Sequence, residues 1–141
     1  MKSVFTILAI AGGVLAQGVQ ITFPFEGLDL IAGTPVNVQV TQLETTSSLQ
    51  NMGIAVAFQH CPQDPCSSVS EAVGPVFFVG PHNPQFSEPP SPIGGPYQNV
   101  TVTIPSNIQK GLAIFSVPHA ALVGADAFFF TEIANVTVNI V

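Results

Sequence analysis

The sequence predicts an all-β protein: a single antiparallel sandwich of about seven strands, of the immunoglobulin or fibronectin type III kind. The clearest evidence is a hexapeptide that occurs twice, as NVTVTI at 99–104 and as NVTVNI at 135–140. Both copies alternate apolar and polar residues strictly, which is the pattern of a strand with one buried and one solvated face. No stretch has helical periodicity. A jelly roll is the main alternative, because the Cys, Trp and Cys pattern of immunoglobulin domains is absent.

The individual strands are predicted from alternation and from the turn residues that flank them. The first strand ends at Pro24, which places it at the edge of a sheet. The third carries small alanines opposite its large side chains, so we expect both of its faces to be covered. In chain order, the predicted strands are 19–23, 36–41, 54–58, 73–79, 99–104, 112–117 and 135–140.

Two stretches between these strands are predicted to be irregular. Residues 43–51 are polar and are predicted to form a loop. Residues 81–97 hold six prolines, and a segment so rich in proline cannot pair within a central sheet. We therefore expect 81–97 to be extended on the surface. Residues 120–125 are expected to extend the sixth strand or to form a short turn.

The first 16 residues have the features of a secretion signal. Lys2 supplies the positive start, residues 4–10 the apolar run, and the Val14-Leu15-Ala16 sequence the small-residue cleavage site. The apolar run is too short to span a bilayer, so we expect no membrane insertion. The sequence thus predicts a signal peptide at 1–16 and a β-sandwich domain at 17–141 that is secreted to the extracellular space.

Charge is scarce and almost entirely negative. The chain has eight acidic residues but only two basic ones, Lys2 and Lys110, and Lys2 belongs to the predicted signal. Nucleic acid binding requires many lysines and arginines to neutralise phosphates, so it is excluded as a function. Electrostatic attraction to anionic lipid headgroups is excluded for the same reason.

Cys61 and Cys66 are the only cysteines. In an oxidising compartment, such a close pair is most simply a disulfide. A ring this small is expected to stabilise the fold by only about 2 kcal/mol, so it would pin a loop rather than hold the domain together. A redox-active pair is the alternative, but it needs a neighbouring cation to lower a thiol pKa, and His60 is the only nearby candidate.

Asn99 and Asn135 each begin an Asn-Val-Thr sequon, at the start of the two repeated hexapeptides. Both asparagines fall on the polar side of the alternating pattern. A glycan on the solvated face of a strand does not disturb the core. We therefore predict that Asn99 and Asn135 are glycosylated.

No set of residues specifies a reaction. The spacing of His60, His82 and His119 does not bring them together, so no metal site is predicted. The copper site of oxidative polysaccharide enzymes uses an N-terminal histidine, whereas the predicted mature chain begins with Gln17. Most carboxylates fall in turns, and no G-x-S-x-G motif is present, so a glycosidase or serine hydrolase is disfavoured. The sequence predicts a protein that is not an enzyme and has no cofactor.

Phenylalanine dominates the aromatic residues, with one tyrosine and no tryptophan. Most phenylalanines lie in strand patterns and are expected in the core. Phe86 and Tyr97 are exceptions, because they flank the proline-rich run. They either pack this long segment against the domain or form a binding patch, in which case the contact surface would comprise residues 61–72 and 81–97. The Asp126–Glu132 end is the alternative contact surface.

Four stretches resemble the fungal necrosis-inducing secreted protein family: GIAVAFQ, VFFVGP, NVTVTIPSNIQKGLAIFSVPHAALVGA and the closing NVTVNIV. This resemblance implies a small secreted effector with a β-sandwich fold, which binds host immune receptor kinases and interferes with them. The opening ITFPFEGLDLIAGTPVNVQV is also similar, over one hairpin, to fungal cell-wall assembly domains of the yeast glucan-synthesis type. No catalytic residues carry over from either group.

The sequence thus predicts a small secreted fungal glycoprotein that acts by binding. The first hypothesis is an effector or immunomodulatory ligand whose partner is a protein receptor of another organism. The alternative is a structural protein of the fungal cell wall, whose partner is a wall glycan. The sequence leaves the oligomeric state open.

Overall fold

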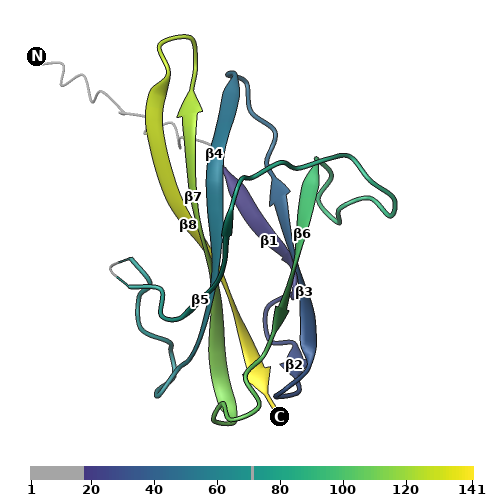
Figure 1. Cartoon of the computed structure of the whole chain (residues 1–141), viewed down its shortest axis with the longest axis vertical. Helices are drawn as coiled ribbons and strands as arrows, with labels where there is room; N and C mark the ends of the chain where they lie inside the picture. The colour runs from purple at the N-terminus through teal and green to yellow at the C-terminus, as the bar shows by residue number, and fades with distance from the viewer. Residues whose placement is uncertain (1–17, 71) are drawn as a thin grey trace, which may run out of the picture.

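The structure is a computed structural model that describes residues 18–70 and 72–141. These residues form a β-sandwich of two sheets, which confirms the all-β prediction (Figure 1). The predicted signal at 1–16 lies outside the described residues. The strands are β1 (Val19–Phe23), β2 (Asp29–Leu30), β3 (Pro35–Gln42), β4 (Leu49–His60), β5 (Val76–Gly80), β6 (Tyr97–Thr103), β7 (Gly111–Val123) and β8 (Phe128–Ile140).

One sheet has three strands in the order β1-β3-β6, and the other has five in the order β2-β8-β7-β4-β5. Strand β1 lies at a sheet edge, as Pro24 predicted. The prediction of about seven strands, all antiparallel, is wrong in one respect: the described residues include an additional strand, β2, which pairs with the end of β8 in parallel. Strand β2 has only two residues, which is too short for alternation to be visible in the sequence.

Three strands of the larger sheet are much longer than predicted. Strand β4 has 12 residues and includes part of the predicted 43–51 loop, while β7 and β8 have 13 each. Strands β7 and β8 form a hairpin that pairs without interruption from Gly111 opposite Ile140 to Val123 opposite Phe128. Pairing with the neighbouring strand extends β7 and β8 beyond the residues that alternate in the sequence. Local alternation therefore underestimated the lengths of these strands.

The main core lies between the two sheets. Both repeated hexapeptides are oriented as predicted: the valines and isoleucines of 99–104 and 135–140 are buried, whereas Asn99 and Asn135 are exposed. Phe58 of β4 and Phe115 of β7 meet at the centre with ring centroids 4.4 Å apart. Buried valines of β3 complete the core from the smaller sheet.

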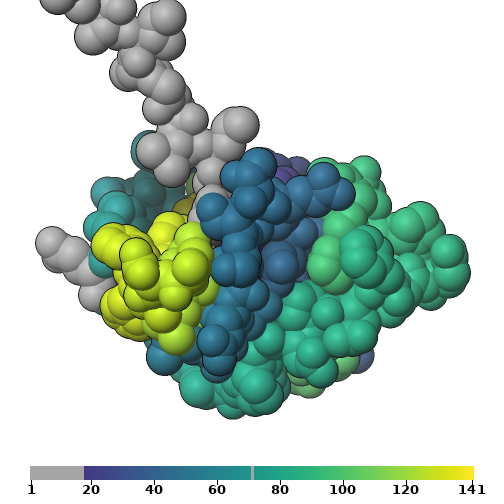
Figure 2. Space-filling model, turned by 90° about the horizontal axis from the view of Figure 1, so that it is seen from above, coloured from purple at the N-terminus to yellow at the C-terminus, as the bar shows by residue number. Residues whose placement is uncertain are grey.

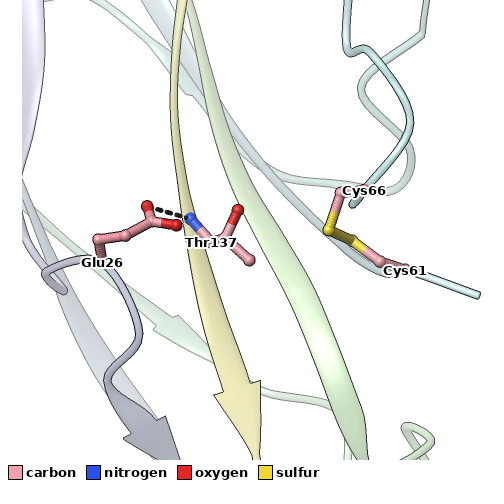
Figure 3. The surroundings of a disulfide bond; sticks show 4 residues. All are labelled: Glu26, Cys61, Cys66 and Thr137. Carbon is pink, nitrogen blue, oxygen red and sulfur yellow. Dashed lines mark hydrogen bonds between the residues drawn. A yellow bond between two sulfur atoms is a disulfide. The ribbon is translucent and has the colours of Figure 1, made fainter. Parts of the chain in front are cut away.

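A second, smaller core lies on the outer face of the five-stranded sheet. There Ile114 packs with Cys61 and Val69 under the loop that follows β4. The predicted disulfide between Cys61 and Cys66 is present and closes this loop. Figure 3 shows the disulfide on one side of the β7–β8 pair and Glu26 on the other. The disulfide therefore holds a covering loop and is separate from the main core.

Removing the disulfide should weaken this loop without unfolding the domain. We expect the double variant Cys61→Ser/Cys66→Ser to lose about 2 kcal/mol of unfolding free energy, because the closed ring is short. Urea denaturation of the variant and of the native protein would measure the difference. A variant that is unfolded without denaturant would show that the outer core is indispensable, contrary to this expectation.

Candidate binding surfaces and a buried polar layer

The apolar core ends in a layer of polar side chains that links the sheets. His119 of β7 is only 2% exposed. Its Nδ1 lies 3.1 Å from Oε1 of Glu132 on β8, and its Nε2 lies 2.8 Å from Oδ1 of Asn51 on β4. Asn51 donates its Nδ2 hydrogen to Oε1 of Gln42, at the end of β3. Both ring nitrogens of His119 are therefore within hydrogen-bond distance of side-chain oxygens, one on β8 and one on β4.

Glu132 also ties the larger sheet to β1. Its Oε1 accepts a hydrogen bond of 2.6 Å from the backbone N–H of Val19. A Cβ atom at Gly18 would collide with this carboxylate, so a larger residue there would have to displace the Glu132 side chain. One carboxylate thus serves both His119 and the first strand of the smaller sheet.

His82 completes the layer from the proline-rich segment. It is 5% exposed, and its ring meets that of His119 edge to face, with centroids 5.3 Å apart. Neither of its ring nitrogens has a hydrogen-bond partner among the described residues. Burial, together with the nearby His119, lowers the pKa of His82 to about 4. His82 is therefore neutral in the folded protein at neutral pH.

The expectation that nothing brings the histidines together is wrong for His82 and His119. Residues 81–85 run beside the start of β6: the N–H of Asn83 bonds to Gln98, and Gln85 pairs with Tyr97. This pairing, which the sequence does not reveal, places His82 in the protein interior beside His119. Among the described residues, no three or more His, Cys, Asp or Glu side chains gather as metal ligands would.

The rest of the proline-rich segment packs against the outer face of the smaller sheet. The hydroxyl groups of Ser91 and Thr41 lie 2.8 Å apart, and Tyr97 donates its hydroxyl hydrogen to the carbonyl of Pro89 at 2.6 Å. Tyr97 is the first residue of β6 and is buried, so its interpretation as an aromatic anchor outside the strands is wrong. It holds the segment down instead. Phe86 is 80% exposed, and its role in binding stays a prediction.

The free end of the β7–β8 hairpin exposes two phenylalanines, a residue type that the sequence predicted to lie mostly in the core. Phe128 is 73% exposed, Phe129 60%, and Met52 in the neighbouring bulge of β4 53%. The hairpin rises beyond the smaller sheet (Figure 1), so within residues 18–70 and 72–141 these side chains have no opposite sheet to pack against. The run Phe128-Phe129-Phe130 indicates that at least one of these side chains faces away from the core, because consecutive residues of a strand point to opposite faces.

Figure 2 looks down on this end of the molecule. The yellow-green residues of the hairpin lie on one side, and the green residues of the proline-rich segment lie on the other. Residues of β3, β4 and their connection, in blue, separate them. The exposed hairpin end and the proline-rich segment, to which Phe86 belongs, therefore lie on different sides of the molecule in this view.

The outer face of the five-stranded sheet carries a groove of about 670 Å³. Its walls come from β4, β7, β8 and the loop at Ser68–Ser70, and Pro118, Ile133 and Val69 make part of it apolar. A smaller hollow of about 270 Å³ lies near β1, where Phe25 and Ile93 border it. Asn135 lines both, so this predicted glycosylation site stands between the two hollows.

Comparison with known protein families identifies the family of this chain. The sequence model of the Nis1 family matches residues 14–139. The chain belongs to the Nis1 family. This agrees with the resemblance to fungal necrosis-inducing secreted proteins, and both family membership and the disulfide are consistent with secretion. None of the described residues forms a helix long and apolar enough to cross a membrane.

A solved structure shares the fold of this Nis1-family protein. It is a cellulose-active LPMO, CelS2, in complex with copper; the TM-score is 0.55 at 17% sequence identity. The match covers 80% of the present chain and 52% of that protein, so the chain spans about half its length. A search among curated proteins found no match.

Proposed function

We propose that this Nis1-family protein is a secreted ligand that binds a protein of another organism through the free end of its β7–β8 hairpin. The observation that carries the proposal is the exposure of Phe128 and Phe129 at that end. Exposed apolar groups gathered at one place are typical of protein interaction sites, and aromatic side chains often supply most of the binding energy.

The length of the hairpin supports this assignment. The strands of the smaller sheet have five to eight residues, whereas β7 and β8 have 13 each. The polar layer of His119 and Glu132 lies at the end of the apolar core, and the β7–β8 hairpin extends beyond this layer. The residues beyond it add little to the main core, and two exposed phenylalanines reduce solubility. Core packing does not account for these residues, whereas contact with a partner does.

The charge of the chain restricts the partner. Asp126 lies in the hairpin turn, next to the exposed phenylalanines, and the whole chain has a formal net charge of −6. The complementary surface is an apolar pocket bordered by lysine or arginine side chains. We infer that the protein acts by occupying such a pocket and catalyses no reaction.

The test is capture of a partner by tagged protein from host membrane extracts. We expect the double variant Phe128→Ser/Phe129→Ser to lower capture at least about tenfold, because both anchors of the contact are removed. Phe86→Ser is the matched control, since it removes an equally exposed phenylalanine from the other surface. Circular dichroism and thermal unfolding would confirm that both variants are folded.

The outcomes separate the competing sites. Undiminished capture by the folded double variant would refute the hairpin as the contact. Loss of capture with Phe86→Ser instead would assign the contact to the proline-rich segment. Fractionation of the producing fungus tests the alternative function: protein released only by hot detergent or glucanase would favour a structural wall component, and free protein in the medium would favour a ligand.

A further inference from the structure

We propose that an N-linked glycan on Asn135 lies in the outer groove of the five-stranded sheet and shields the open edge of β8. Asn135 is exposed and begins an Asn-Val-Thr sequon, so its side-chain nitrogen is open to the modifying enzyme. It also lines the groove of about 670 Å³. The first sugar of a glycan attached at this position would begin at the groove itself.

The lining of the groove suits a sugar. Pro118 and Ile133 offer apolar surface to the carbon face of a pyranose ring and to an N-acetyl methyl group. Ser68, Ser70 and Thr131 carry hydroxyl groups that can bond with sugar hydroxyls. Ser68 and Ser70 belong to the loop that follows the Cys61–Cys66 disulfide, so one wall of the groove is held by a covalent link.

The backbone of β8 gives a second, independent reason to place a glycan here. Glu26 accepts a hydrogen bond from the N–H of Thr137, and Gly27 donates one to its carbonyl, so both groups of Thr137 point away from β7. Backbone groups two residues apart in a strand point the same way. The N–H and C=O of Asn135, and of Ile133 and Thr131 before it, therefore also point to the outer edge.

Strand β2 pairs with this edge only at Asn139 and Ile140. Before Thr137, the edge of β8 is not paired with a strand among the described residues. An unpaired edge is a template for pairing with another chain, and proteins commonly block such edges. A bulky hydrophilic glycan on Asn135 would do so at the first outward-pointing residue beyond the Glu26 and Gly27 contacts.

Asn99 provides an internal control. It begins the other Asn-Val-Thr sequon and is also exposed, but it lies on the smaller sheet and pairs with Gln39 of β3. It lines neither of the two hollows. A glycan on Asn99 would extend into solvent, so the two sites should differ in every property that depends on contact with the protein.

The experiment uses full-length protein secreted from a yeast host, with the variants Asn135→Gln and Asn99→Gln. We expect mass spectrometry to find glycans at both sites. In the folded protein, peptide N-glycosidase F should release the Asn99 glycan readily and the Asn135 glycan at least tenfold more slowly. Loss of the Asn135 glycan should lower the melting temperature by a few degrees and promote dimers or larger species in size-exclusion chromatography, whereas loss of the Asn99 glycan should do neither.

An unmodified Asn135 would overturn the proposal. Equal release of both glycans, together with the same melting temperature and monomeric state in both variants, would also overturn it, because the Asn135 glycan would then make no contact. Thr137→Val removes the same sequon while keeping Asn135, so it should reproduce the Asn135→Gln behaviour. Agreement between these variants would exclude a direct effect of the lost asparagine.

Discussion

Lowering the pH from 7 to 4 should destabilise the folded protein by about 2 kcal/mol through His82 alone, a figure that allows for partial solvent screening. Burial and the adjacent His119 lower the pKa of His82 in the fold to about 4, below the ordinary value of 6.5. Between these values the unfolded chain binds a proton that the folded protein does not. Protonation of His82 therefore leaves the free energy of unfolding unchanged above pH 6.5 and lowers it as the pH falls from 6.5 towards 4. Below pH 4 His82 causes no further loss.

Urea denaturation at several pH values would measure this dependence. The Glu132 carboxylate also contacts His119, so the informative quantity is the difference in pH dependence between the native protein and His82→Phe. Phenylalanine keeps an aromatic ring against His119 but binds no proton, so its stability should depend less on pH by about 2 kcal/mol. Identical pH profiles for the two proteins would mean that His82 is not buried as a neutral ring.

Replacing Glu132 with alanine should cost about 3 kcal/mol of unfolding free energy, because one substitution leaves two buried donors without an acceptor. The Glu132 carboxylate serves both the N–H of Val19 and Nδ1 of His119. Losing the first bond loosens β1 from β8, and losing the second leaves the ring of His119 partnered only by Asn51. The free energy of unfolding in urea, at pH 7, is the measurement.

Glu132→Gln is the matched control, because its amide oxygen still accepts a hydrogen bond but carries no charge. We expect it to lose about 1 kcal/mol, clearly less than the alanine variant. Equal losses for the two variants would show that the negative charge of Glu132, and not its acceptor geometry, holds the layer together. A loss of a few tenths in the alanine variant would contradict the structural role of the layer altogether.

The repeated hexapeptides show what the sequence by itself could determine. Alternation is a local property of the chain, since side chains of a strand point to opposite faces in turn. It therefore correctly assigned the buried valines and the exposed Asn99 and Asn135. The disulfide could also be predicted from the sequence, because Cys61 and Cys66 are close in the chain and are its only cysteines.

The sequence offered the candidate binding site at the hairpin end only as an alternative, because local patterns did not show that its phenylalanines are exposed. Whether a phenylalanine on a strand is buried depends on whether the opposite sheet extends that far, and beside Phe128 it does not. Conversely, Tyr97 was expected outside the strands, but the proline-rich segment folds back over it and accepts its hydroxyl hydrogen. Local alternation and composition do not encode the relative lengths of the two sheets, so they wrongly placed Phe128 in the core and could not decide between the two alternatives for Tyr97.

The polar layer depends still more on tertiary structure. His82, His119 and Glu132 come from a loop and two strands, and their spacing in the sequence gives no reason to group them. They meet because the β7–β8 register places His119 opposite Glu132, and because residues 81–85 pair alongside β6. The sequence by itself determined which faces of the strands are buried and which cysteines join. Only the tertiary structure decided where the core ends, because that depends on contacts between segments distant in the chain.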